Sequence, residues 1–260
     1  MLPRVLAVIL VPLYTTVMLP EEYGVYATLM AYLILGNVLL SYGMETAFFR
    51  FITKDGNQQK IVQSTTLTSI SVSTLVFLGI TLLFTNQIAT VAEFKPEYVT
   101  YGLLILALDA LVVLPFAWFR VNERPMRYAV VKIFNVVVNL AFNLFFLLLL
   151  PKLAVNSSFW NSLWFPENKV AYVFIANLIA SAVTLLVLLP LYVKIGFGFN
   201  KTIWKQMMKY AIPVLIAGIA FSVNEAFDRI LLKYLLPENI AETQVGLYSA
   251  CYKLGMFMTL

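Results

Sequence analysis

The chain has 260 residues, of which 61% are hydrophobic and only 12% are charged, and its net charge is +5. A soluble domain carries about 45–50% apolar and about 25% charged residues, so this composition excludes a soluble globular protein. The sequence has no histidine and one cysteine, Cys251, which excludes histidine-based hydrolases, intrachain disulfides and cysteine zinc sites. We expect no catalytic residues, no metal, no cofactor and no nucleic-acid partner.

Eight apolar runs follow one another along the chain. A helix needs roughly 20 apolar residues to cross a bilayer core about 30 Å thick, and each run approaches or meets that length. The sequence therefore predicts an all-α integral membrane protein with about eight transmembrane helices. The last run stops at the chain end without a flanking loop, which predicts a chain truncated at its C-terminus. The runs lie at Leu2–Leu19, Val25–Phe48, Ser64–Thr85, Tyr98–Phe119, Tyr128–Leu150, Val170–Val193, Tyr210–Leu232 and Val245–Leu260.

Positive charges are concentrated in alternate loops between these runs. Short cytoplasmic loops of membrane proteins carry an excess of lysine and arginine. We therefore expect the loops after the second, fourth and sixth runs, and the N-terminus, to face the cytoplasm of a bacterial-type inner membrane. Glutamates dominate the other loops. The cations of the predicted cytoplasmic loops are Arg50, Lys54, Lys60, Arg120, Arg124, Arg127, Lys132, Lys194, Lys201, Lys205 and Lys209.

A short pattern occurs near both ends of the chain. Leu19-Pro20-Glu21 precedes Gly24-Val25-Tyr26, and Leu236-Pro237-Glu238 precedes Gly246-Leu247-Tyr248. The two copies stand six spans apart, so they favour a parallel repeat over a coincidental helix stop followed by an acidic turn.

Between the sixth and seventh runs, Lys201, Lys205 and Lys209 recur every four residues while apolar side chains gather on another face. This pattern predicts a basic amphipathic helix that lies on the inner leaflet. The predicted domains are a six-helix transmembrane lobe at 1–198, the amphipathic linker helix at 199–209, and the first two helices of an incomplete second lobe at 210–260.

Four stretches spread over the whole chain resemble one family, that of the polysaccharide biosynthesis proteins. These are O-antigen-flippase-type members of the multidrug/oligosaccharidyl-lipid/polysaccharide exporter superfamily. The stretches are Val11-Pro12-Leu13-Tyr14-Thr15 with Pro20-Glu21-Glu22-Tyr23-Gly24; Gly43-Met44-Glu45-Thr46-Ala47-Phe48-Phe49-Arg50-Phe51; Tyr210-Ala211-Ile212-Pro213 through Asp228-Arg229; and Gly246-Leu247-Tyr248-Ser249 with Tyr252-Lys253.

This resemblance implies two helical lobes that form a V around a central cavity. It also implies a transporter rather than an enzyme, which exports undecaprenyl-pyrophosphate-linked oligosaccharide to the outer leaflet by alternating access. Its partners would be the lipid-linked glycan, membrane lipids and a coupling ion, either a proton or sodium. Two alternatives remain. A multidrug antiporter of the same superfamily would favour acidic cavity residues, and a membrane glycan polymerase or ligase would place its chemistry in a large outer loop.

Ionisable residues inside the apolar runs are the main functional candidates, because each costs about 2.5–3.5 kcal/mol at the centre of a membrane helix. Glu225 and Arg229 are four residues apart, which predicts an ion pair on one helix face. Asp228 then needs another partner, and Lys253 in the next span is the expected counter-cation. Alternatively, Lys253 meets the substrate pyrophosphate, as the family resemblance implies. We assign Glu225 and Asp228 to ion coupling and Arg229 to the cations of the cavity.

Three further charged residues lie in earlier spans. Arg4 either contacts substrate or reaches the inner headgroups. Asp109 has no partner nearby in the sequence, so it is the better candidate for ion coupling, whereas Glu45 is expected to pair locally with Arg50.

The fifth run carries Lys132, Asn135, Asn139 and Asn143 at spacings that place them along one helix face. Lipid would leave the three carboxamides without hydrogen-bond partners, so this polar stripe must face protein or water. The asparagines either bond to neighbouring helices or contact sugars in the cavity.

Overall fold

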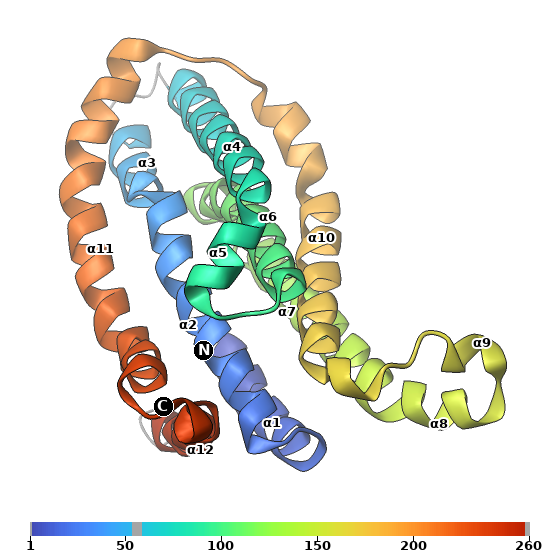
Figure 1. The fold of residues 1–260 in the computed structure, drawn as a ribbon. Coiled ribbons are helices and arrows are strands. Elements are labelled where there is room, and N and C mark those ends of the chain that lie inside the picture. Colours follow the sequence, from blue (N-terminus) through green and yellow to red (C-terminus); the bar gives the residue numbers. More distant parts are fainter. Residues whose placement is uncertain (1, 54–58, 258–260) are drawn as a thin grey trace.

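The computed structural model describes residues 2–53 and 59–257, and this part of the chain consists of helices and connecting loops without any strand (Figure 1). The all-α fold is therefore confirmed. Lys54, one of the predicted loop cations, lies outside the described residues. The helices are α1 (Leu2–Val17), α2 (Pro20–Ser41), α3 (Met44–Ile52), α4 (Gln59–Leu83), α5 (Thr85–Ala92), α6 (Pro96–Val121), α7 (Pro125–Leu144), the π-helix η2 (Phe145–Leu149), α8 (Leu150–Asn156), α9 (Ser158–Asn161), the 3-10 helix η3 (Pro166–Asn168), α10 (Lys169–Ile195), α11 (Lys201–Leu235) and α12 (Glu238–Phe257).

Six helical stretches in the described residues are long and apolar enough to cross a membrane, which makes this a multi-pass membrane protein. They coincide with the second to seventh predicted spans. The first and last predicted spans are helical as well, as α1 with 16 residues and α12 with 20. The six stretches are Pro20–Ile52, Gln59–Leu83, Pro96–Val121, Pro125–Val155, Pro166–Ile195 and Lys201–Leu235.

The second span is broken between α2 and α3. Tyr42 and Gly43 have φ angles of 33° and 69°, a left-handed conformation that ends α2 and redirects the chain into α3. A Cβ atom on Gly43 would overlap the carbonyl oxygen of Ala211 in α11. Glycine is therefore required here both by the backbone conformation and by the close approach of α11.

The predicted linker helix at 199–209 is continuous with the seventh span, which corrects the expectation of a separate element. Asn200 caps this helix, because its side-chain oxygen accepts hydrogen bonds from the main-chain N–H groups of Thr202 and Ile203. The helix continues through Pro213 to Leu235 and bends over one end of the molecule (Figure 1).

The apolar face of this first part of α11 packs against protein. Ile203 and Met207 are buried in a cluster with Phe48 of α3 and Leu67 of α4, whereas Lys201 and Lys205 are exposed. The predicted amphipathic pattern is therefore present, and α3 and α4 cover Ile203 and Met207 on its apolar face.

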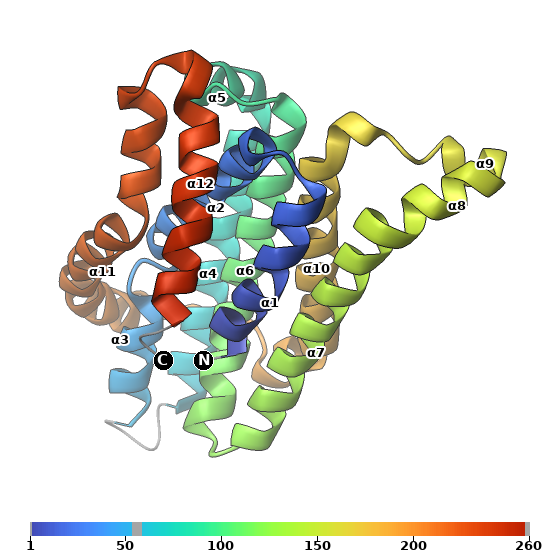
Figure 2. The ribbon, with the colours of Figure 1, turned by 90° about the horizontal axis from the view of Figure 1, so that it is seen from below.

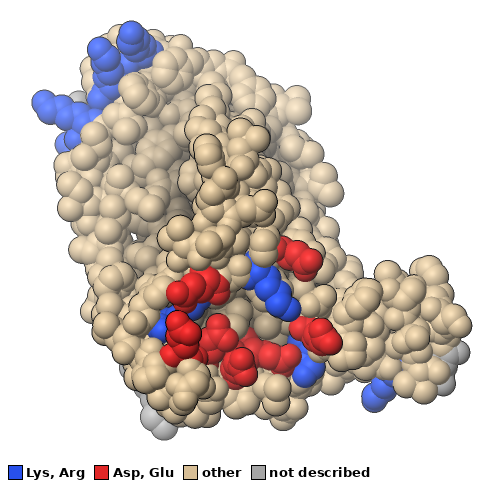
Figure 3. Space-filling view, in the orientation of Figure 1, with Lys and Arg blue, Asp and Glu red and all other residues tan. Residues whose placement is uncertain are grey.

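Charge separates the molecule into two ends. The basic end holds the start of α11 with Lys201, Lys205 and Lys209, and the acidic end holds the starts of α2, α6 and α12 (Figure 3). Glutamates of the acidic end are Glu21, Glu22, Glu93, Glu97, Glu238 and Glu242. We use the names basic end and acidic end for these two sides.

The two helices that begin the predicted repeat, α2 and α12, pack closely against each other. A Cβ on Gly24 would overlap the carbonyl oxygen of Glu242, and a Cβ on Gly246 would overlap that of Pro20. Each glycine thus lies against the residue four positions before the other glycine, so the contact is reciprocal, like one across a two-fold axis. Helices in lipid associate through such small residues because backbones can approach closely there. Viewed from below, α1 lies beside α12, while α8 and α9 project from the body (Figure 2).

Candidate functional site

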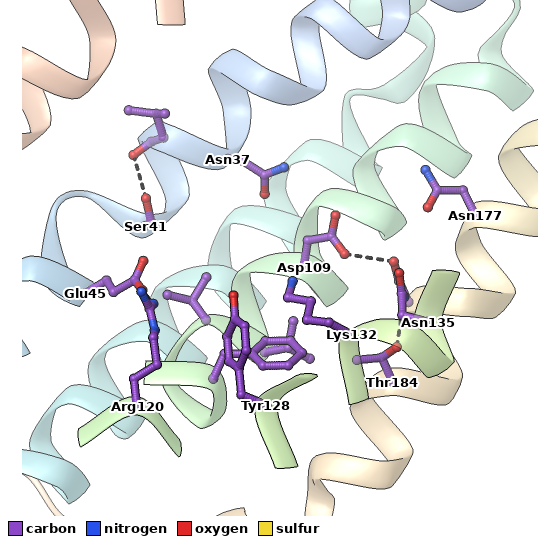
Figure 4. Close-up of a pocket in the computed structure, with 15 residues that line it drawn as sticks. Asn37, Ser41, Glu45, Asp109, Arg120, Tyr128, Lys132, Asn135, Asn177 and Thr184 are labelled. Carbon is purple, nitrogen blue, oxygen red and sulfur yellow. Dashed lines mark hydrogen bonds and ion pairs between the residues drawn. The ribbon is translucent and has the colours of Figure 1, made fainter. Parts of the chain in front are cut away.

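A polar cavity of about 490 Å³ opens between α2, α3, α6, α7 and α10. Its lining contains two carboxylates, two cations, three amides and four hydroxyls, an unusual collection for a space between transmembrane helices. Figure 4 shows these side chains converging from helices that are far apart in sequence. The lining residues are Asn37, Val38, Ser41, Glu45, Asp109, Val112, Val113, Phe116, Arg120, Tyr128, Lys132, Asn135, Asn177, Ser181 and Thr184.

Asp109 forms the deep end of the cavity, about midway along α6. The hydroxyl of Ser181 in α10 donates a hydrogen bond of 2.8 Å to its Oδ1. Because the rest of the surrounding α6 sequence is apolar, this carboxylate is the one charged group in the central turns of the helix. A carboxylate at that depth needs a cation, a proton or water to offset its desolvation.

Lys132 of α7 provides the nearest cation on the cavity wall. Its Nζ lies 4.2 Å from the centroid of the Phe116 ring and is directed toward Asp109 (Figure 4). The aromatic face stabilises the ammonium group from one side. Within the described residues, Lys132 forms no ion pair with Asp109 at 4.0 Å or less, although both line the same cavity.

A second pair of charges lines this cavity nearer the basic end. Arg120 of α6 forms an ion pair with Glu45 of α3, which corrects the expected local pair of Glu45 with Arg50. Five positions along a helix rotate a side chain by about 140°, so Arg50 points to another face. There its guanidinium lies 4.4 Å from the centroid of the Tyr210 ring of α11.

The asparagine stripe of α7 makes contacts to two other helices, α10 and α1. Asn135 lines the cavity and donates to the Thr184 hydroxyl of α10 at 2.9 Å. Asn139 donates to the Asn177 side chain at 3.3 Å, and Asn143 accepts a hydrogen bond of 2.9 Å from the Tyr14 hydroxyl of α1. Of the three asparagines, Asn135 alone contributes to this cavity, while Asn139 and Asn143 bond helix to helix.

The charged cluster of α11 has different partners from those expected. Arg229 is 6% exposed, and its Nη1 donates to the main-chain oxygen of Glu225 at 2.8 Å and lies 3.6 Å from Asp228 Oδ1. Arg229 therefore pairs with the carboxylate of Asp228 and not, as expected, with that of Glu225. The Tyr248 hydroxyl of α12 donates to Asp228 Oδ2 at 2.5 Å.

Lys253 of α12 is not brought to Asp228 within ion-pairing distance among the described residues. Its Nζ lies 5.2 Å and 5.1 Å from the ring centroids of Tyr23 and Tyr26 in α2. These rings and Tyr14 form an aromatic cluster below the amine. Arg4 belongs to α1, but its side chain lies outside the part that the structure describes.

Several cavity residues were missed by sequence reasoning. Lys132 is predicted both as a loop cation and as the first residue of the polar stripe, but not as a site residue, although that stripe was the available signal. Asn37 and Ser41 of α2 are four residues apart, and Asn177, Ser181 and Thr184 of α10 follow one another at spacings of four and three. These spacings place each set on one helix face, and they were the available signal. Among the described residues, no group of three or more acidic or cysteine side chains is arranged to hold a metal ion.

Comparison with known proteins gives one match. A family model described as "Polysaccharide biosynthesis protein" matches residues 1–260. No curated protein and no solved structure matches the chain.

Proposed function

The chain belongs to the polysaccharide biosynthesis protein family, and from that premise we propose that it moves a lipid-linked oligosaccharide from the inner to the outer leaflet of a bacterial-type inner membrane. Membership of the family gives the chain a role in polysaccharide biosynthesis. The proposed carrier is undecaprenyl pyrophosphate. The protein would act as a transporter by alternating access, without catalysing a covalent step.

The polar cavity is the observation that supports this proposal most directly. A glycan carries many hydroxyls and its carrier carries a pyrophosphate, and neither crosses hydrocarbon without polar partners. Amides, hydroxyls and the Lys132 ammonium line a space that reaches from the basic end toward the middle of the membrane helices. Such a lining suits a headgroup that enters from the cytoplasmic side.

Within this proposal, the charged groups divide into two roles. Asp109 takes up the coupling ion, a proton or sodium, because it is a carboxylate in the central turns of α6 with a single hydroxyl donor. Lys132, Lys253 and Arg229 are the cations that offset the pyrophosphate charge, and Arg4 is retained as a candidate. Asp228 and Glu225 are the second group proposed for ion coupling. The lobes at 1–198 and 210–260 would rock against each other.

The direct test is the distribution of the lipid-linked oligosaccharide in cells that lack this protein. We expect the oligosaccharide to accumulate in the inner leaflet, where it is shielded from glycosidases added to spheroplasts, and expression of the full chain to restore exposure. Unchanged exposure combined with increased sensitivity to cationic drugs would instead support the multidrug antiporter.

Orientation can be tested by labelling with an impermeant maleimide after Cys251→Ser removes the native thiol. We expect a cysteine at Asn161 to react in intact cells, because Asn161 is the exposed last residue of α9, on the side that is proposed to face outward. A cysteine at Asn122, exposed at the basic end, should react only after permeabilisation, since the cation-rich loops are proposed to be cytoplasmic. Reaction of Asn122→Cys in intact cells would reverse the topology.

A further inference from the structure

Lys233 connects α11 to the loop that follows α5. The side chain is 7% exposed, and its Nζ donates hydrogen bonds of 2.8 Å to the main-chain oxygen of Ala92 and 3.2 Å to that of Glu93. Its two acceptors are 141 and 140 residues away in sequence. A lysine in the last turn of α11, at the acidic end of the molecule, therefore binds main-chain carbonyls that are far away in sequence.

The chemistry of this contact is that of a helix cap supplied by another helix. The last carbonyls of α5 have no N–H donors within their own helix, and they carry the negative end of its dipole. Glu93 adopts a left-handed φ of 56° and ends the helix. The Lys233 ammonium satisfies two of these carbonyls, and the Phe94 ring lies 3.6 Å from its Nζ. An amine this buried is stable only while these partners stay in place.

Two tyrosines extend the same contact to α2. The hydroxyl of Tyr234 lies 3.4 Å from the Ala92 oxygen and 3.1 Å from the hydroxyl of Tyr32 in α2. The Tyr32 ring packs edge-on against Phe94, with ring centroids 6.1 Å apart. We call this set the acidic-end clasp: Tyr32, Ala92, Glu93, Phe94, Lys233 and Tyr234.

The clasp closes a tightly packed seam between α2 and α11. About one and two turns before Lys233, Ile230 and Ala226 of α11 are buried against Ala31 of α2. Because Ala31 and Ala226 are 1% and 0% exposed, α2 and α11 pack closely over this length. Any state in which the space between α2 and α11 opens at the acidic end must first remove Lys233 from its carbonyls.

We propose that Lys233 is a positioning residue that holds the acidic end closed, by binding the C-terminal carbonyls of α5. Glu242 of α12 and Glu93 at the end of α5 add attraction for the ammonium group. The contact itself stands without any assumption about activity, but its consequence for transport rests on the proposed function. For a transporter, breaking the clasp would be a step of opening toward the acidic end.

The test measures how often the seam opens, independently of transport. In a full chain carrying Cys251→Ser, Ala31→Cys places a thiol at a position that is 1% exposed. We expect this thiol to resist an impermeant maleimide applied from the acidic side. Lys233→Met keeps the length of the side chain and removes its charge and donors. It should raise the labelling rate roughly tenfold, because charge-assisted hydrogen bonds to buried carbonyls are lost.

Matched variants distinguish the specific loss of the acidic-end clasp from a general loosening of the helix packing. Lys95→Met removes an exposed lysine of the same loop that stands over Tyr98, and it should leave labelling of Ala31→Cys unchanged. Lys233→Arg should restore most of the protection, since the guanidinium keeps charge and donors. Tyr234→Phe should raise the labelling rate of Ala31→Cys less than Lys233→Met does. It provides a second test of the clasp if Lys233→Met does not fold.

Two results would overturn the proposal: a labelling rate in both Lys233→Met and Tyr234→Phe equal to that of the parent, or an equal rise in Lys95→Met. Failure of the proposed function gives a different pattern. In that case Lys233→Met still raises labelling, but neither the parent chain nor any variant changes the exposure of lipid-linked oligosaccharide in the cell.

Discussion

Asp109→Asn is expected to reduce export of lipid-linked oligosaccharide by roughly tenfold or more, a barrier increase of at least about 1.4 kcal/mol, while the protein still accumulates in the membrane. Asparagine keeps the shape of the side chain and can still accept the hydrogen bond from Ser181, so the packing of α6 against α10 is preserved. The change removes only the ability to carry a charge or a proton. Export is measured as oligosaccharide exposed on spheroplasts, and folding as a monodisperse peak in detergent.

A second variant distinguishes ion coupling from simple charge balance with Lys132. If Asp109 only balances that cation, the double change Asp109→Asn with Lys132→Gln leaves no net charge and should recover export. If Asp109 takes up the coupling ion, the double variant stays inactive. Glu97→Gln is the matched control, because it neutralises an exposed carboxylate at the start of the same helix. Wild-type export by Asp109→Asn would remove this residue from the mechanism.

The fold was predictable because hydrocarbon imposes a length and an apolarity that can be counted along the chain. The positions of the second to seventh spans follow from that constraint alone. Counting apolar residues does not show whether two neighbouring helical segments form one continuous helix. Asn200 caps a helix that continues through Pro213, since a membrane helix can accommodate a proline without ending there.

The site was only partly predictable, because its partners come from different helices. Asp109 was recognised as lacking a local partner, yet Ser181 and Lys132 lie on α10 and α7, and no short-range pattern joins them. Where spacing along one helix was used to predict an ion pair, contacts with other helices changed the partner. Arg229 has suitable spacing for an ion pair with the Glu225 carboxylate. The centroid of the Tyr252 ring of α12 lies 4.6 Å from its guanidinium carbon, and this contact helps to hold the guanidinium away from that carboxylate.

The repeat explains why two particular glycines should be intolerant of change. Gly24 and Gly246 occupy equivalent positions of the predicted repeat, and each faces a main-chain carbonyl of the other helix. Rotating a side chain cannot relieve an overlap with main-chain atoms, so a methyl group at either position must push α2 and α12 apart. The acidic end, where these helices start, would then lose its close packing.

Gly24→Ala and Gly246→Ala are each expected to destabilise the protein by about 1–3 kcal/mol, the usual cost of overpacking a tight contact. In a domain of this size that corresponds to a fall in Tm of roughly 2–4 °C per kcal/mol. Gly79→Ala is the control, because Gly79 lies inside α4 and a Cβ there meets nothing within 4 Å. Alanine is the better helix former by about 1 kcal/mol, so Gly79→Ala should keep or raise the Tm. Thermal unfolding of the three variants in detergent measures the difference. A Tm for Gly24→Ala or Gly246→Ala as high as that of Gly79→Ala would mean that α2 and α12 do not pack backbone to backbone.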